Sequence, residues 1–224
     1  MYERAWAGVR RGRWGMRPAS TVRGLTGSAW YARGVTVLAR QFFTFDAYVE
    51  LEAGSPIKHE FLDGQVWAMA GRSPEHAAVS GAVIRLLGQA LAGRRCRVFT
   101  SDLRVRVVAT GLTSYPDATV ICGSVELDPA DRSGHTAINP TFVAEVLSPT
   151  TEDYDRGEKL AHYKRVAALR EVALIAHDEH RVELWRRVGD HWTLLTFRGG
   201  EVVTLESLGC ALEVDAIYFD PLAG

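Results

Sequence analysis

Two short apolar runs, each carrying one carboxylate, constrain this chain more than any other feature. Residues 115–122 and 141–150 are rich in β-branched and aromatic residues. Runs of this kind are typical of strands that are buried on both faces. Asp117 follows a proline at the start of the first run, a position that suits proline in a strand, and Glu145 lies inside the second run.

The two acids predict a shared site. A carboxylate inside a buried strand is costly unless it is paired, hydrogen-bonded or metal-bound. If the two strands are neighbours, Asp117 and Glu145 lie together, where they repel unless they share a proton or hold a divalent cation. Carboxylates with a neighbouring backbone carbonyl suit Mg²⁺ or Mn²⁺. The alternative is two half-exposed acids at strand ends, each paired with an arginine.

The charge of the chain is unevenly distributed. Residues 1–40 contain eight arginines and one acid, Glu3, and so carry +7, which leaves −8 on the remainder of a chain whose net charge is −1. We predict a poorly ordered extension of no fixed role, because chain ends are commonly loose. An arm that binds nucleic acid and a transit-like leader are the alternatives.

Composition narrows the class of protein. The length of 224 residues and the apolar content of 47% are those of a single globular domain with a full core. No apolar run approaches the ~18 residues that cross a bilayer, so no membrane partner is expected. Cys96, Cys122 and Cys210 are far apart, which predicts neither a zinc ribbon nor a disulfide framework and fits a reducing cytoplasm. Phosphate-loop, serine-hydrolase and zinc-protease motifs are absent from the sequence.

Periodicity and turn residues predict one α/β domain over residues 41–224. The expected elements are, in order, a short helix capped by Thr44, a hairpin over 58–62 and 65–70, a helix from Pro74 to Ala92, strands at 96–100 and 103–108, the two acid-bearing strands separated by a loop at 123–140, a helix over 152–168, a strand at 172–176, and a hairpin over 181–188 and 191–198. The core is expected to be closed by Leu205, Leu208, Leu212, Val214, Ile217 and Phe219.

Further side chains are candidates for the site. Lys159 lies on the helix after the second acid-bearing strand, where it can point back at the carboxylates and stabilise negative charge on a phosphate. A solvated helix lysine is the alternative, and Lys164, on another helix face, is the second choice. Glu60 lies in the first hairpin, and His76 in a first helical turn that favours an anion. Asp102 is either a further carboxylate of the site or a turn residue.

These motifs resemble a known family. Pro116 and Asp117, followed about thirty residues later by Glu145, resemble the Pro-Asp…Glu-x-Lys signature of restriction-endonuclease-like nucleases. More closely, residues 43–219 resemble the Uma-two family of bacterial endonucleases. The residues that carry this resemblance are Glu60 to Gly64, Ser73 and Pro74 with His76, Tyr115 to Asp117, Glu145 to Thr150, and Asp155 with Lys159 and Tyr163.

The resemblance implies a fold and a reaction. The fold is a restriction-endonuclease-like mixed β-sheet flanked by helices, with an N-terminal hairpin and a C-terminal β-hairpin. The reaction is the hydrolysis of DNA phosphodiester bonds with Mg²⁺ or Mn²⁺, in the cytoplasm. Asp117, Glu145 and the carbonyl of Val146 are the implied metal ligands. A homodimer is left open.

The sequence departs from the superfamily signature at one position. Leu147 stands where the superfamily carries its lysine, and leucine cannot orient a water. Lys159 is expected to replace that lysine, and Glu60 to complete the acidic cluster.

The departure keeps two other functions open. One is a catalytically inactive nucleic-acid-binding or regulatory module that retains the nuclease fold, and the other is a metal-dependent hydrolase of a small phosphorylated substrate. Because an acidic surface repels phosphates, a DNA-binding module would need the basic arm or a local basic patch. The candidate arginines for such a patch are Arg94, Arg95, Arg97, Arg104 and Arg106.

Overall fold

The computed structural model describes residues 42–69 and 73–222, and the extension predicted over residues 1–40 lies outside them. All the elements belong to one unit, Arg40–Gly224. The helices are α1 (Phe45–Gly54), α2 (Pro74–Ala90), α3 (Glu152–Tyr154), α4 (Leu160–Tyr163) and α5 (Val214–Ile217), and a π-helical turn, η1 (Asp155–Lys159), joins α3 to α4. The strands are β1 (His59–Leu62), β2 (Gln65–Ala68), β3 (Cys96–Thr100), β4 (Arg104–Arg106), β5 (Thr113–Ser114), β6 (Ala118–Cys122), β7 (Thr136–Ala137), β8 (Phe142–Val146), β9 (Glu171–Ile175), β10 (Arg181–Val188), β11 (His191–Arg198), β12 (Val202–Leu205) and β13 (Cys210–Glu213).

The strands form mixed sheets. The largest has six strands in the order β11-β10-β9-β8-β6-β3, and a second has five in the order β2-β1-β5-β4-β7. Strands β8 and β9 are parallel, as are β4 and β7, while the remaining neighbours are antiparallel. The predicted mixed sheet with helices and two hairpins is therefore confirmed.

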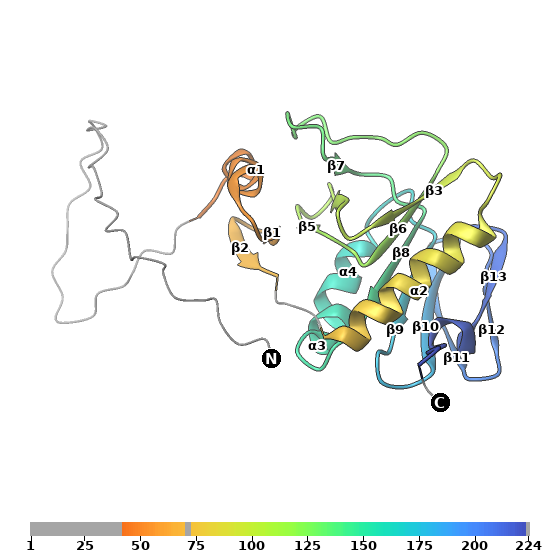
Figure 1. Ribbon diagram of the computed structural model, residues 1–224. Coiled ribbons are helices and arrows are strands. Elements are labelled where there is room, and N and C mark those ends of the chain that lie inside the picture. Colours follow the sequence, from red (N-terminus) through yellow and green to blue (C-terminus); the bar gives the residue numbers. More distant parts are fainter. Residues whose placement is uncertain (1–41, 70–72, 223–224) are drawn as a thin grey trace, which may run out of the picture. The chain divides into compact units, whose positions relative to one another are not determined.

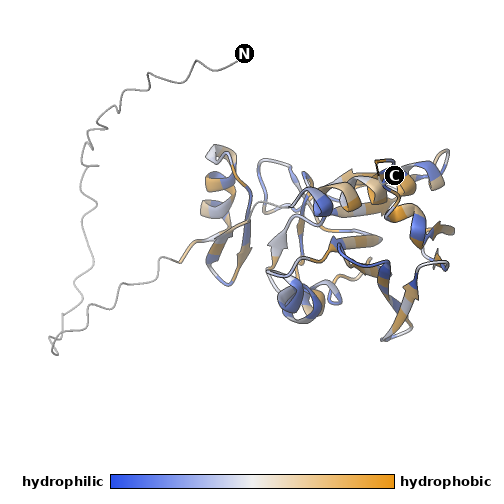
Figure 2. Cartoon of the chain, turned by 60° about the horizontal axis from the view of Figure 1, so that its bottom comes forward, coloured by the Kyte–Doolittle hydropathy of each residue, from blue (hydrophilic) through white to orange (hydrophobic). Residues whose placement is uncertain are grey.

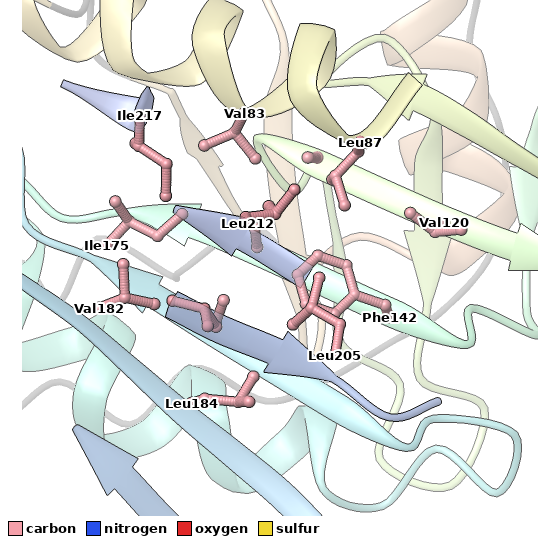
Figure 3. Close-up of a cluster of buried hydrophobic side chains, with 14 of the residues drawn as sticks. Val83, Leu87, Val120, Phe142, Ile175, Val182, Leu184, Leu205, Leu212 and Ile217 are labelled. Carbon is pink, nitrogen blue, oxygen red and sulfur yellow. The ribbon is translucent and has the colours of Figure 1, made fainter. Parts of the chain in front are cut away.

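The main core lies between α2 and one face of the six-stranded sheet (Figure 1). Val83 and Leu87 of α2 point towards Val120, Phe142 and the neighbouring strands (Figure 3). Strands β12 and β13 and helix α5 close this core with Leu205, Leu208, Leu212, Val214 and Ile217, as predicted. Figure 2 shows hydrophobic and hydrophilic residues interspersed along the elements, as expected where one side of an element is buried and the other exposed.

The opposite face of the six-stranded sheet carries a second apolar cluster. Val143 of β8 and Leu147, the residue that follows this strand, pack there against Leu160 and Tyr163 of α4. Alternate residues of a strand share a face, so Glu145 lies on this same side of the sheet. The face that receives α4 is therefore the one that presents the glutamate.

Strong local signals produced the expected elements. Thr44 and Ser73 cap α1 and α2, and their side chains accept hydrogen bonds from the backbone N–H groups of Ala47 and His76. The last hairpin has the predicted strand bounds, 181–188 and 191–198.

Three expectations about the chain were wrong. The helix predicted over residues 152–168 contains the π-helical turn and ends at Tyr163. The loop predicted at 123–140 contains the short strand β7, which pairs with β4. Phe219 is 70% exposed and does not belong to the core.

The cysteine prediction was also wrong. Cys96 and Cys122 are direct partners on the antiparallel strands β3 and β6 and form a disulfide. Strand pairing brings their Cα atoms within 3.9 Å although 26 positions separate them in the sequence. Cysteine spacing alone does not reveal a cross-strand pair of this kind.

No helix within residues 42–69 and 73–222 has the length and apolar character needed to cross a membrane.

The turn of the first hairpin gives a testable prediction. Asp63 and Gly64 both have positive φ, as a two-residue turn of the I′ type requires. A Cβ on Gly64 would lie 2.8 Å from Cδ1 of Phe42 and 3.3 Å from the carbonyl oxygen of Phe43. We expect Gly64→Ala to lower the free energy of unfolding by about 1–2 kcal/mol in urea denaturation.

Gly88→Ala is the control for this substitution. Gly88 lies within α2, and no atom within 4 Å would meet its added Cβ. We expect this control to stabilise the protein by about 0.5–1 kcal/mol. If Gly64→Ala were equally stabilising, the turn would not require glycine.

Candidate active site

Strands β6 and β8 bring the two predicted acids together. Their register pairs Ala118 with Ala144, so Asp117 and Glu145 come next on the same face. Asp117 is 4% exposed and Glu145 2%. The backbone N–H of Val146 donates a hydrogen bond to Oδ2 of Asp117 at 2.8 Å. The acids are thus buried neighbours and not half-exposed residues paired with arginines.

Lys159 lies at the centre of a carboxylate cluster. Its Nζ is 2.8 Å from Oε1 of Glu60 and 3.0 Å from Oε1 of Glu145. Oδ1 of Asp155 is 3.5 Å away. The lysine is only 3% exposed, so it is not a solvated helix residue. The geometry therefore joins Lys159 and Glu60 to the acid pair, as the sequence predicted.

The packing around β8 explains how this lysine reaches the cluster. Leu147 lies two residues after Glu145, on the same face, and packs in the apolar cluster beneath α4. The cation comes instead from Lys159 in the π-helical turn η1, which lies directly before α4 in the chain. A π-turn closes i→i+5 hydrogen bonds and so holds more residues than an α-turn, and such turns recur at functional sites. Here it places Asp155 and Lys159 side by side in the site.

Tyr163 and Asp155 carry the family resemblance in the sequence, but no contact with the carboxylate cluster was predicted for them. The Tyr163 hydroxyl donates a hydrogen bond to Oε1 of Glu145 at 2.6 Å, and it lies 2.9 Å from Oγ of Ser114. The ring of Tyr163 packs in the apolar cluster beneath α4 while its hydroxyl reaches the carboxylate. The available signal was the four-residue spacing of Asp155, Lys159 and Tyr163, which puts them on one side of the helical segment.

The cluster changes the protonation of its members. Burial raises the pKa of Glu145 to about 8, where the Lys159 ammonium acts to lower it and the charge of Asp117 acts to raise it. Burial also raises the pKa of Asp155. Burial lowers the pKa of Lys159, but the carboxylates of Glu145, Glu60 and Asp155 outweigh it and hold that pKa well above its usual value. Lys159 is therefore a cation at neutral pH.

Of the other candidates from the sequence, His76 lies in the site, whereas Asp102 and Lys164 lie outside it. Nε2 of His76 lies 3.3 Å from Oδ2 of Asp117, so the first turn of α2 reaches the acid pair. Asp102 pairs instead with Lys58 at 2.6 Å and is a largely exposed turn residue, the second of the two alternatives that the sequence left open. Lys164 lies over the ring of Trp185, 3.3 Å from its centroid, rather than in the cluster.

Three of the five arginines of the predicted basic patch bind partners within the protein. Arg104 and Arg106 are paired with Asp131 and Asp128, each at 2.7 Å. The guanidinium of Arg94 donates hydrogen bonds to two backbone carbonyls near β13. These side chains have internal partners, so they do not form the phosphate-binding patch that the sequence suggested.

A cavity of about 580 Å³ opens onto the carboxylate cluster. Its lining includes Glu60, Glu145, Asp155 and Lys159 together with Trp67. A substrate in this cavity would therefore meet the charged groups directly.

The donor chemistry of the cluster fits a divalent cation. Asp117, Glu145, Glu60 and Asp155 together leave three net negative charges around Lys159 when all five are ionised. Within the described residues, no group of three or more His, Cys, Asp and Glu side chains is arranged to hold a metal. Mg²⁺ commonly keeps several waters and takes only one or two carboxylates, so the pair of strand acids, without a third side chain, is the candidate metal site.

The family relationship agrees with this geometry. Residues 45–216 match the Uma2 family model, whose description is "Putative restriction endonuclease". The chain belongs to the Uma2 family. This finding confirms the resemblance seen in the sequence, because Uma2 is the Uma-two family named there.

Relatives of this Uma2 protein occur in cyanobacteria. The uncharacterized proteins slr1290 and sll1609 of Synechocystis sp. are 34% and 31% identical to it, each over 77% of this chain and over 90% and 96% of their own lengths. A crystal structure from Anabaena variabilis, described as "a putative nuclease belonging to DUF820", matches with a TM-score of 0.61 and 18% identity, over 76% of this chain and 97% of the other. The Uma2 protein thus has the restriction-endonuclease-like fold.

Proposed function

We propose that this chain is a divalent-metal-dependent endonuclease that hydrolyses phosphodiester bonds in DNA. The observation that carries the proposal is the position of Lys159, whose Nζ lies 3.0 Å from Glu145 although Leu147 occupies the usual lysine position. Membership of a family whose description is "Putative restriction endonuclease" supports nuclease chemistry.

The proposed metal ligands are Asp117, Glu145 and the carbonyl of Val146. A bound Mg²⁺ or Mn²⁺ would supply a Lewis acid for the phosphate and a water of lowered pKa.

The side chains of the cluster have separate tasks. The Lys159 ammonium stabilises the negative charge that develops on the phosphate and orients the attacking water. Glu60 holds Lys159 from the hairpin at 2.8 Å. Tyr163 fixes one oxygen of Glu145 through its hydroxyl. Rigid placement of this kind lets a site act without reorganising during the reaction.

One observation favours the catalytically inactive module. Leu147 is 2% exposed and packed in the apolar cluster, so it cannot turn towards a substrate. If Lys159 serves only to balance buried charge, the protein retains the nuclease fold but does not cleave DNA.

Cleavage of supercoiled plasmid and of a single-stranded DNA circle tests the proposal. We expect the full-length protein to cut DNA with Mg²⁺ or Mn²⁺ but not with EDTA, and Asp117→Ala to cut neither substrate. Asp102→Ala is the matched control, because that acid is exposed and paired outside the cluster, and it should cut as the wild type does. A folded wild-type protein that cuts no DNA with either metal would support the inactive module.

A further inference from the structure

Trp67 stands beside the carboxylate cluster with its ring partly in solvent. It is 45% exposed, and it lines the cavity that opens onto Lys159. In the first hairpin Trp67 is the direct partner of Glu60. Cross-strand partners point to the same face of a hairpin, so the indole and the Glu60 carboxylate both face the cavity. The hairpin therefore presents an aromatic ring next to the residue that holds Lys159.

The charged groups of the site are almost fully buried. Asp117, Glu145, Asp155 and Lys159 are each at most 5% exposed. A phosphate reaches Glu145, Asp155 and Lys159 from the cavity that they line. In a duplex the phosphates lie on the outside of a stiff double helix, which does not bend enough to bring a phosphate and its base into a cavity together. An unpaired strand can bend its backbone inwards and place a base against the wall.

The size and lining of the cavity suit such a strand. Its volume of about 580 Å³ falls within the ~300–1,000 Å³ of cavities that enclose small organic ligands. Trp67, Met69 and Pro149 give it an apolar side. Lys159 gives it a cation, which lies among the carboxylates of the lining: Glu60, Glu75, Glu145 and Asp155. Proteins that bind single strands combine aromatic rings for the bases with positive charge for the backbone.

We propose that the substrate of this site is unpaired DNA, with one base stacked on Trp67 and the adjoining phosphate at Lys159. The inference rests on the proposed nuclease function and adds the class of substrate. Stacking on an aromatic ring does not distinguish bases, so the site is expected to bind unpaired strands of any sequence.

Binding without cleavage tests this inference separately from the nuclease proposal. All proteins are full-length and carry Glu145→Gln, a neutral replacement for a carboxyl whose pKa is about 8, and all measurements are made in EDTA. Fluorescence anisotropy reports the Kd for a labelled single-stranded 20-mer and for the same sequence in a duplex. We expect the single strand to bind at least tenfold more tightly. Trp67→Ala should weaken single-strand binding by about tenfold and leave duplex binding unchanged.

Two further variants separate stacking from general damage. Trp67→Phe keeps an aromatic ring and should retain most of the single-strand affinity. Phe219→Ala removes an exposed aromatic side chain that does not line the cavity, and should change neither Kd.

The outcomes separate the two proposals. If Trp67→Ala leaves single-strand binding intact, or weakens both DNAs by the same factor, the inference falls, whatever the cleavage assay shows. If the wild type cuts no DNA but the preference for single strands depends on Trp67, the assignment of unpaired DNA stands and the nuclease proposal falls.

Discussion

Lys159→Ala should lower Mg²⁺-dependent DNA cleavage by a factor on the order of 10²–10³. That is the usual effect of removing one preorganised electrostatic contact to a transition state. The ammonium of Lys159 is the only side-chain cation that the described contacts place on Glu145, and Leu147 cannot replace it. Single-turnover cleavage of the supercoiled plasmid and of the single-stranded circle measures the chemical step directly. Mg²⁺ binding is expected to persist because the strand acids remain.

The same substitution alters the charge of the cluster, so the fold needs its own measurement. Without Lys159, the carboxylates of Glu60, Glu145 and Asp155 lose their shared cation. Circular dichroism and thermal unfolding in Mg²⁺ show whether the variant remains folded.

Lys164→Ala is the matched control. It removes the same side chain five residues later, from a position over Trp185, and should leave the cleavage rate within a few-fold of the wild type. If Lys159→Ala, folded and metal-bound, cleaves DNA as fast as Lys164→Ala, Lys159 has no part in the mechanism.

The sequence was most informative where a local signal and the tertiary structure agree. Asp63 and Gly64 specify a tight turn by themselves, so the first hairpin was predicted closely. The acid pair was also predictable, because Asp117 and Glu145 interrupt runs that are otherwise apolar. Their approach then required only that β6 and β8 be neighbours.

Features set by distant contacts could not be predicted. The helix after β8 ends at Tyr163 although the sequence continues with helix-compatible residues. Beyond it, the carbonyls of Lys164 and Val166 accept hydrogen bonds from the distant Arg187. The partners of Tyr163 and Asp155 depend on the π-helical turn, which periodicity does not reveal. The disulfide between Cys96 and Cys122 depends on the register of two strands.

The environment of Arg104 also depends on distant contacts that the sequence did not predict. In the sequence Arg104 was a candidate for a basic patch that contacts phosphate. In the structure Arg104 is 4% exposed and its guanidinium donates hydrogen bonds to Asp131 and Thr136. It also lies over the ring of Tyr48, 5.6 Å from the centroid. The segment after β6 supplies both partners of Arg104 and buries its side chain.

Arg104→Ala should therefore lower the free energy of unfolding by about 3 kcal/mol in urea denaturation at pH 7. Removing one partner of a buried ion pair costs roughly 3–5 kcal/mol, since the other charge stays buried. The lower end of this energy range applies because Asp131 keeps hydrogen bonds from Ser133 and Thr136 when Arg104 is removed. Arg97→Ala removes an exposed arginine and should change stability by no more than about 0.5 kcal/mol. Equal stabilities of the two variants would show that the Arg104 pair contributes nothing.

The pH dependence of this difference checks its cause. Burial raises the pKa of Asp131, but hydrogen bonds from Ser133, Thr136 and Arg104 outweigh it and hold that pKa well below its usual range. A depressed carboxyl pKa stabilises the fold above the pKa of the unfolded chain, ~3.9 for aspartate, and this contribution disappears as the pH falls towards the folded value. The wild type should therefore lose more stability than Arg104→Ala between pH 5 and pH 2, and the gap between them should narrow. A gap that stays constant over this range would assign the effect of Arg104 to packing against Tyr48 instead of to its charge.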